Sequence, residues 1–143
     1  MVETVPAMPD LTRFHDAQAD TYATALAELR AGRKRSHWMW FVFPQIAGLG
    51  RSPTARRYAV ADLAEARAFL ADPTLGPRLE EAARALLAHD APAEEILGAT
   101  DAMKLRSSMT LFREAGAEFA QPVLDRFWGG APDPATLDLL DRG

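Results

Sequence analysis

Apolar residues recur along this chain at the three- and four-residue spacing of an α-helix, and this spacing limits what the chain can fold into. Between residues 11 and 29, one helix face carries Leu11, Phe14, Tyr22 and Leu29. Valine and isoleucine, which favour strands, total only seven of 143 residues, whereas alanine and leucine are abundant. No alternation of apolar and polar residues persists for more than a few positions. The sequence therefore predicts an all-α fold.

Residues that start and stop helices divide this pattern into about seven or eight short helices. Asp10, Ser52, Asp62 and Thr100 are placed to cap N-termini, and Gly32 is placed to end a helix in a left-handed conformation. The connections are short and contain no linker, which predicts a compact orthogonal bundle. The predicted helices span residues 11–29, 53–60, 63–70, 77–87, 93–97, 101–115, 119–127 and 134–140.

Composition favours a globular cytoplasmic protein. Hydrophobic residues make up 48% and charged residues 25% of the chain, and cysteine is absent, which excludes disulfides and thiolate chemistry. Neither a signal peptide nor an apolar stretch of membrane-spanning length is present. We expect one helical domain over residues 10–143, a flexible leader at 1–9, and no membrane partner. We expect neither a cofactor nor a metal, because the histidines lack ligand spacing; they are His15, His37 and His89.

Charge is distributed unevenly along the chain. The net charge is −4, yet residues 29–61 contain no aspartate or glutamate and carry +7, while the remainder carries −11. A region of one charge sign attracts partners of the opposite sign, so we expect an anionic partner here. The alternative is that these side chains pair with acids on neighbouring helices. The seven basic residues are Arg30, Arg33, Lys34, Arg35, Arg51, Arg56 and Arg57.

An aromatic run at residues 38–43 follows three consecutive basic residues. It is expected to form a buried helical turn or a short helix, and a short strand is the alternative. Trp38 and Trp40 can stack a base or hold a flat ligand beside the basic residues. The alternative interpretation is that the tryptophans anchor the core, and one ring can serve each purpose. Lys34 and His37 join them as predicted ligand-binding residues.

A glycine loop at residues 48–52 is a second candidate binding element. Gly48 and Gly50 allow the backbone to approach a ligand closely, and Ser52 leads into a helix N-terminus that favours phosphate or carboxylate. Arg51 adds positive charge. The loop lacks the lysine of a P-loop and the strand context of a dinucleotide fingerprint. The alternative is therefore a plain turn and helix cap.

A third candidate combines a carboxylate, an ammonium and hydroxyl groups on one predicted helix. Asp101, Lys104 and Ser108 share a helix face, and Ser107 lies beside them. We expect Asp101, Lys104 and Ser108 to be catalytic and Ser107 to contact the ligand. A Ser–Lys nucleophile pair is conceivable with this arrangement. The alternative is an ordinary ion pair within one helix, with a serine beside it.

Three strings of the sequence resemble those of a known family. They are GRKRSHWMWFVFPQ at 32–45, GLGRS at 48–52 and DAMKLRSSMTLF at 101–112. They are similar to a family of small bacterial proteins of unknown function, sometimes labelled calpastatin, and the resemblance covers residues 11–140. It implies an all-helical fold and no particular activity. Gln45, at the end of the first string, joins the predicted ligand-binding residues. Calpastatin is a disordered inhibitor, which does not suit a chain with this many periodic apolar residues.

These features together predict a site for an anionic, nucleotide-like small molecule, built by residues 33–57 and completed by residues 101–108. If turnover follows, we expect hydrolysis or transfer at a nucleotide, with Asp101 as base and Lys104 as charge stabiliser. A shorter run, ILGATDAMK at 96–104, resembles small helical N-glycosidase domains of nucleotide and ADP-ribose metabolism, and no residue roles are carried over from it. The alternative function is a non-catalytic module whose basic face docks on nucleic acid or on an acidic protein.

Overall fold

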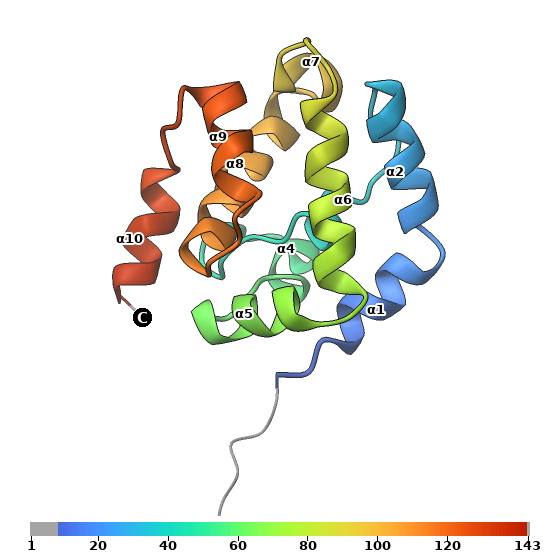
Figure 1. Ribbon diagram of the computed structural model, residues 1–143. Helices are drawn as coiled ribbons and strands as arrows, with labels where there is room; N and C mark the ends of the chain where they lie inside the picture. Colours follow the sequence, from blue (N-terminus) through green and yellow to red (C-terminus); the bar gives the residue numbers. More distant parts are fainter. Residues whose placement is uncertain (1–8, 143) are drawn as a thin grey trace, which may run out of the picture.

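The computed structural model describes residues 9–142, and in that range it consists of ten α-helices without a strand (Figure 1). The all-α prediction is confirmed, with more helices than the seven or eight expected. Of the leader expected at 1–9, all but Pro9 lies outside the described residues. The helices are α1 (Thr12–Ala19), α2 (Tyr22–Ala31), α3 (Met39–Val42), α4 (Pro53–Arg57), α5 (Leu63–Ala71), α6 (Leu75–Leu87), α7 (Ala93–Leu97), α8 (Ala99–Glu114), α9 (Ala120–Trp128) and α10 (Pro134–Arg142).

The single helix predicted over residues 11–29 is in fact two helices. α1 ends at Ala19 and α2 begins at Tyr22. α1 packs against α3, whereas α2 packs against α6. At the break, the buried side chain of Gln18 donates a hydrogen bond to the backbone carbonyl of Phe41 (2.8 Å). The apolar spacing continues through the break, so spacing alone does not reveal it.

The helix ends at Gly32, Ser52 and Asp62 follow the residues expected from the sequence, whereas Asp10 precedes the N-cap residue of α1, Leu11, and accepts a hydrogen bond from the N–H of Thr12 (2.9 Å). The side chains of Ser52 and Asp62 accept hydrogen bonds from backbone N–H groups three residues later, as N-caps do. Gly32 follows α2 with φ of 76°, the left-handed conformation that glycine adopts most easily. The prediction for Thr100 is wrong. α8 begins directly after Gly98, whose φ is 88°, so Thr100 lies inside the first turn.

The prediction for the aromatic run at residues 38–43 is confirmed, whereas the helix after the glycine loop is shorter than predicted. The run contains α3, which confirms a short buried helix rather than a strand. The helix expected over 53–60 ends earlier, at Arg57. Val60 instead lies beside Ile46 in an isolated parallel bridge, where its N–H donates to the carbonyl of Gln45 (2.8 Å). Pairing with a distant segment thus takes Val60 out of the helix.

The core lies around α8, which contacts α5, α7, α9 and α10. Aromatic rings of Phe14, Phe69 and Phe112, from three helices, meet there with centroids 5.1 and 5.3 Å apart. In Figure 1, α5 lies across the lower end of α6, as in an orthogonal bundle. None of the helices in the described part of the chain is long and apolar enough to cross a membrane.

Candidate functional site

The connection between α2 and α3 is the element that builds the site. Along residues 33–38, exposed and less exposed side chains alternate: Arg33, Arg35 and His37 are exposed, whereas the three between and after them are partly or fully buried. The inward-facing residues of this connection are Lys34, Ser36 and Trp38. The connection therefore presents one row of side chains to the interior and another to solvent.

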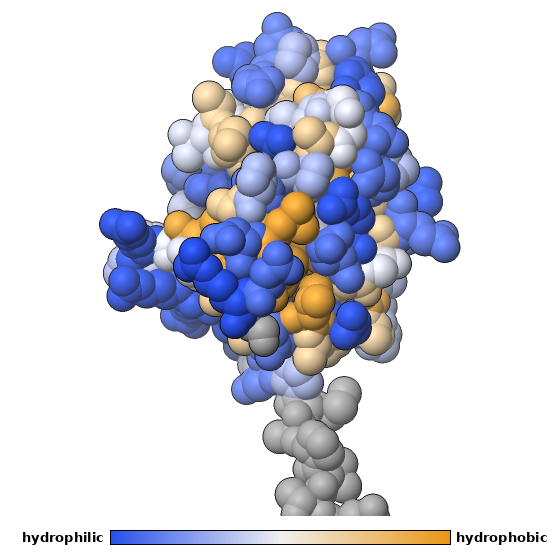
Figure 2. All heavy atoms as spheres, turned by 90° about the vertical axis from the view of Figure 1, so that its left-hand side faces the viewer, coloured by the Kyte–Doolittle hydropathy of each residue, from blue (hydrophilic) through white to orange (hydrophobic). Residues whose placement is uncertain are grey.

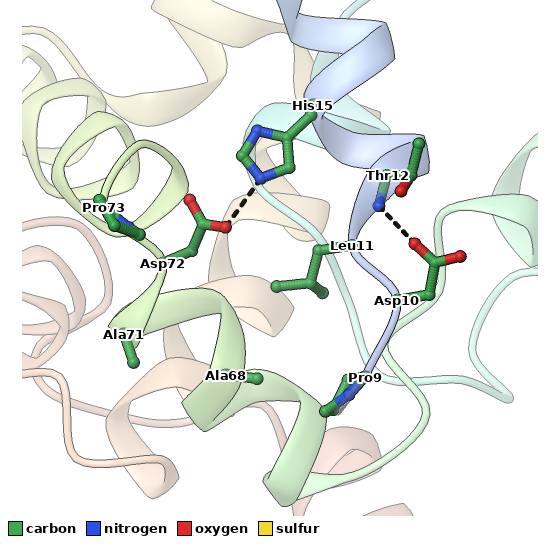
Figure 3. Close-up of a pocket in the computed structure, with 9 residues that line it drawn as sticks. All are labelled: Pro9, Asp10, Leu11, Thr12, His15, Ala68, Ala71, Asp72 and Pro73. Atoms are coloured by element: carbon green, nitrogen blue, oxygen red, sulfur yellow. Dashed lines mark hydrogen bonds and ion pairs between the residues drawn. The ribbon is translucent and has the colours of Figure 1, made fainter. Parts of the chain in front are cut away.

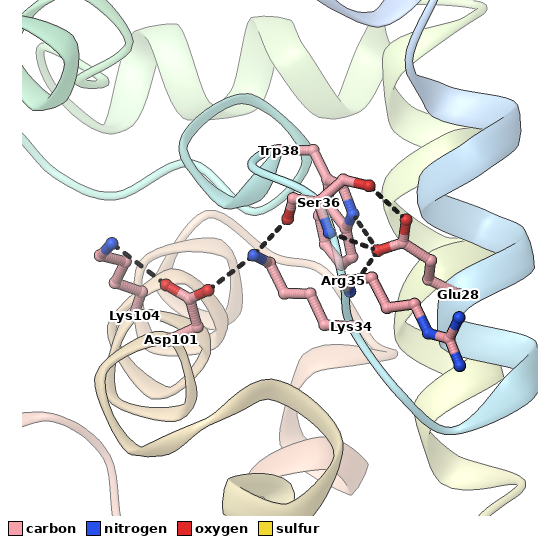
Figure 4. A network of polar contacts seen from close by, with 7 residues as sticks. All are labelled: Glu28, Lys34, Arg35, Ser36, Trp38, Asp101 and Lys104. Carbon is pink, nitrogen blue, oxygen red and sulfur yellow. Dashed lines mark hydrogen bonds and ion pairs between the residues drawn. The ribbon is translucent and has the colours of Figure 1, made fainter.

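Glu28 of α2 fixes this connection from one side (Figure 4). Its carboxylate accepts hydrogen bonds from the backbone N–H groups of Arg35 (2.7 Å) and Ser36 (2.9 Å), from the Ser36 hydroxyl, and from the indole Nε1 of Trp38 (3.0 Å). Burial raises the pKa of Glu28, but these hydrogen bonds outweigh burial and bring the pKa down to about 2. On the other side, the Lys34 N–H donates to the carbonyl of Ile96 in α7 (2.7 Å).

Two lysines meet one aspartate where this connection contacts the start of α8 (Figure 4). The Nζ of Lys34 lies 2.8 Å from Oδ2 of Asp101, and the Nζ of Lys104 lies 3.1 Å from Oδ1 of the same residue. The side chains of Lys34, Asp101 and Lys104 are only 8%, 18% and 21% exposed. The expected meeting of residues 33–57 with the helix that carries Asp101 is thus present.

Each lysine also lies over a tryptophan ring. The Nζ of Lys34 is 5.1 Å from the centroid of Trp38, and the Nζ of Lys104 is 4.4 Å from the centroid of Trp40, both within the range of a cation–π contact. Trp38 is fully buried and belongs to the core, whereas Trp40 is partly exposed. The sequence allowed one ring to serve each purpose, and this is what the structure shows. Trp38 is a core anchor, whereas Trp40 lies at the surface of the cluster that Lys34, Asp101 and Lys104 form.

The charges of this cluster favour holding an anion over accepting a proton. Burial raises the pKa of Asp101, but hydrogen bonds and charges from Lys34 and Lys104 outweigh it and lower the pKa below its ordinary value. Both carboxylate oxygens already contact an ammonium, so Asp101 is a fixed counter-charge and a weak base. Two ammonium groups against one carboxylate leave an excess of positive charge in a partly buried place.

The hydroxyls expected beside Lys104 lie in different surroundings. Ser108 is fully buried, and its Oγ has no hydrogen-bond partner among the described residues. Ser107 lies on another side of α8, where its hydroxyl donates to Oδ2 of Asp133 (2.8 Å) ahead of α10. The same carboxylate oxygen accepts from the Thr136 hydroxyl (2.6 Å), so this contact ties α8 to α10. Ser107 is thus separated from the lysine cluster.

The structure places the remaining predicted residues outside the described contacts of the cluster. Gly48 lies against Leu139 of α10, and a side chain at Gly50 would meet Ala55. Ser52 caps α4. The other three predicted residues are the exposed Arg51, the exposed His37 and the partly buried Gln45. The structure therefore brings together Lys34, Trp38, Trp40, Asp101 and Lys104.

Glu28 is the site residue that sequence reasoning missed. In the sequence it is an acid on an amphipathic helix, next to a buried leucine, and such acids usually face solvent. Its partners begin seven residues later, beyond the end of α2. The one available signal was position: Glu28 is the last acid before the long acid-free segment.

Several hollows of the surface lie apart from this cluster. One of about 450 Å³ contains the pair of His15 Nε2 and Asp72 Oδ2, 2.7 Å apart (Figure 3). Burial raises the pKa of Asp72, but the backbone N–H groups at the start of α6 and His15 outweigh burial and lower it. A smaller, mainly apolar hollow of about 300 Å³ lies between Leu63 of α5 and Leu139 of α10. Figure 2 shows the face that carries α10, where hydrophobic residues are interspersed with hydrophilic ones.

Comparison with known proteins gives a family and a fold. Residues 8–140 match a family described as "Protein of unknown function (DUF1810)". The chain is also similar to the crystal structure of the conserved hypothetical protein Rv1873 from Mycobacterium tuberculosis, with 48% sequence identity and a TM-score of 0.90. That match covers 92% of this chain and 96% of the other. A comparison with curated proteins gives no match. The resemblance to a family of unknown function is confirmed, and nothing in these matches concerns calpastatin.

Proposed function

The chain belongs to the DUF1810 family, and we propose that it binds an anionic, nucleotide-like small molecule at the cluster of Lys34, Trp40, Asp101 and Lys104. One observation supports this proposal above the others: a single carboxylate holds two partly buried ammonium groups, which leaves one positive charge without a partner in the cluster. Charges interact more strongly in such a place than in water, so an anion gains more there than at an exposed lysine.

Lys104 is the group that would contact the ligand. Its Nζ has three N–H donors, of which one faces Asp101, and it is the most exposed of the three charged side chains. Lys34 is nearly buried, and its donors face Asp101 and the carbonyl of Ser36. Lys34 would thus hold Asp101 in place while Lys104 meets a phosphate or carboxylate.

Trp40 would supply the recognition of a flat ring. Its indole is partly exposed and lies beside Lys104, so a ligand that carries both an anion and an aromatic ring can use both residues. Stacking of a base on an aromatic side chain contributes about 1–3 kcal/mol. This combination favours a nucleotide-like ligand over a simple anion.

Turnover by hydrolysis or group transfer would use the same residues. Lys104 would stabilise the negative charge that develops on a phosphate oxygen. Asp101 would act as a base only after a lysine leaves it, because its lowered pKa makes it a weak base in the present geometry. Binding without turnover is therefore the simpler form of the proposal.

A thermal-shift screen of nucleotides and sugar phosphates tests the proposal. A ligand at about 100 times its dissociation constant adds roughly 2.7 kcal/mol of stability, which is a clear rise in melting temperature. Lys104→Gln should weaken binding by about tenfold to a hundredfold, because a charge-assisted hydrogen bond is lost. The matched control is Arg84→Gln, which removes an exposed charge on α6. A loss of ligand binding in Arg51→Gln would show that the glycine loop at residues 48–52 also contacts the ligand.

Two results would contradict the proposal. One is equal weakening by Lys104→Gln and Arg84→Gln, and the other is a screen in which no phosphate-bearing compound raises the melting temperature. Binding of nucleic acid at low salt, with a steep loss as salt rises, would favour the interaction module instead. A pocket for one small ligand should lose affinity less steeply.

A further inference from the structure

The outward row of the connection between α2 and α3 is a charged surface that the proposed ligand site does not use. Arg33, Arg35 and His37 are exposed at alternate positions, while the side chains between them face the interior. Figure 4 shows the guanidinium of Arg35 pointing away from the contact of Lys34 with Asp101. This row is called the outer row below.

The backbone beneath the outer row is held in place. The N–H of Arg33 donates to the carbonyl of Glu28 (3.1 Å), and the N–H of Arg35 donates to the Glu28 carboxylate (2.7 Å). Between them, the N–H of Lys34 donates to Ile96 (2.7 Å). Since each of these three successive N–H groups is bonded, the arginine side chains start from fixed points rather than from a free loop.

Arg33 and Arg35 differ in their partners from the exposed arginines Arg30 and Arg84, each of which is paired with a glutamate. Arg30 lies 3.6 Å from Glu81, and Arg84 lies 2.8 Å from Glu80. Among residues 9–142, no acidic side chain forms an ion pair with Arg33 or Arg35. The lack of acids between Glu28 and Asp62 explains this in part. The alternative from the sequence, that neighbouring helices supply the acids, does not hold for these two residues within that range.

A hollow lies beside the two arginines. It has a volume of about 520 Å³ and is lined by Arg33, Arg35 and one side of α2, which contributes Thr24, Ala27 and Ala31 together with Glu28. Its floor is made of small side chains, and the hydrogen bonds of the Glu28 carboxylate hold that group toward the connection. A segment of chain can therefore lie in the hollow with its acidic side chains toward the arginines.

We propose that the outer row and this hollow bind an acidic segment of a partner protein in an extended conformation. Extended chains rise about 3.2–3.4 Å per residue, so side chains two residues apart lie about 6.5 Å apart on the same side. Arg33 and Arg35 have this separation in sequence and are both exposed. Carboxylates at alternate positions of the partner segment would match them one to one.

Charge favours an acidic protein segment over nucleic acid as the partner. The chain has a net charge of −4 and an isoelectric point of about 5.3. Nucleic-acid-binding domains typically have isoelectric points above about 9 and contact many phosphates. Two arginines above a floor of small side chains suit a short segment with few charges. The proposal is independent of the ligand proposed for Lys34 and Lys104.

The test is an NMR titration with two peptides of equal composition. One is a blocked decapeptide in which glutamate and alanine alternate; the other, the block peptide, has the order EEAAEEAAEA, in which no two glutamates lie two residues apart. We expect the alternating peptide to shift the amide signals of residues 33–37 and to bind several-fold more tightly than the block peptide. The double variant Arg33→Gln, Arg35→Gln should weaken binding of the alternating peptide by about twofold to thirtyfold, since each exposed ion pair contributes about 0.2–1 kcal/mol. The matched control is Arg56→Gln, Arg57→Gln, which removes two exposed arginines from α4.

Any of four results would overturn the proposal. They are the absence of shifts at residues 33–37, equal affinity for both peptides, equal weakening by the control variant, and tighter binding of an oligothymidylate than of the alternating peptide. Because the probe is a peptide and the variants leave Lys34 and Lys104 unchanged, failure here is separable from failure of the small-molecule proposal.

Discussion

At the scale of single residues, Glu28 organises more of its surroundings than any group predicted from the sequence. Its carboxylate accepts hydrogen bonds from two successive backbone N–H groups of the connection after α2. These N–H groups have no partner in a helix or a sheet of residues 9–142, so Glu28 fixes the backbone there. It also satisfies the indole N–H of Trp38, which is fully buried. A buried donor without a partner is costly, so this contact matters for stability as well as position.

We expect Glu28→Ala to lower the free energy of unfolding by roughly 1.5–3 kcal/mol, the usual contribution of hydrogen bonds to a charged group. Glu28→Gln should cost less, because its amide oxygen can still accept from the backbone. Urea denaturation measures both values. Equal stability of the alanine variant and the wild type would show that water replaces Glu28 without cost.

The low pKa of Glu28 predicts a loss of stability in acid. Its folded-state pKa is about 2, against an ordinary value of 4.5. The ionised form therefore stabilises the folded state fully above a pH of about 4.5, and this contribution is lost as pH falls toward 2. Asp72 and Asp101, whose pKa values are also lowered, change stability in the same direction. Unfolding measured between pH 7 and 2 should show a shallower decline for Glu28→Gln, and identical curves would contradict this assignment.

At the scale of elements, the contact between α5 and α6 depends on Gly76. This glycine is buried in the first turn of α6, and a Cβ added to it would lie 2.1 Å from the backbone carbonyl oxygen of Leu70. A backbone atom cannot move aside as the end of a side chain can. The close crossing of the two helices in Figure 1 therefore requires the absence of a side chain at this position.

Gly76→Ala should destabilise the fold by about 1–3 kcal/mol or more, as overpacked sites do, although alanine favours helices intrinsically. Thermal denaturation measures the effect. Gly116→Ala is a partial control, since a Cβ there meets nothing within 4 Å and only its φ of 102° opposes the change. A stabilised Gly76→Ala variant would show that the crossing relaxes easily.

At the scale of the whole molecule, the contact of Lys34 with Asp101 joins segments that are distant in the sequence. The connection after α2 meets the first turn of α8 there, and Lys104 adds a second ammonium to the same carboxylate. Removing Lys34 leaves Asp101 paired with Lys104. Removing the charge of Asp101 instead leaves two neighbouring ammonium groups without a counter-charge.

We therefore expect Asp101→Asn to be more destabilising than Lys34→Gln, with a cost of about 3 kcal/mol for breaking a buried pair. Added sulfate should restore part of the stability of Asp101→Asn, because an anion that binds the folded state stabilises it. Glu80→Gln is the control, since its partner Arg84 is exposed and such pairs contribute about 0–1 kcal/mol. If Asp101→Asn and Lys34→Gln lost equal stability, Asp101 would not be the counter-charge that both lysines need.

The local secondary structure could be predicted from the sequence, because it depends on residues that are close together in the chain. The helical class follows from apolar spacing, and the caps at Ser52 and Asp62 follow from side chains that bond three residues away. The grouping of Asp101 with Lys104 is likewise a property of one helix, because the residues are one turn apart.

Long-range packing supplied everything else, because the residues concerned meet only after the chain folds back. The break between α1 and α2 reflects different partners for the two halves, and Val60 leaves its helix because it pairs with residues near Ile46. Ser107 faces Asp133 rather than the lysines, although it is adjacent to Ser108 in the chain. Glu28 becomes a binding group for the connection only because that connection turns back over α2, and no local pattern encodes such a turn.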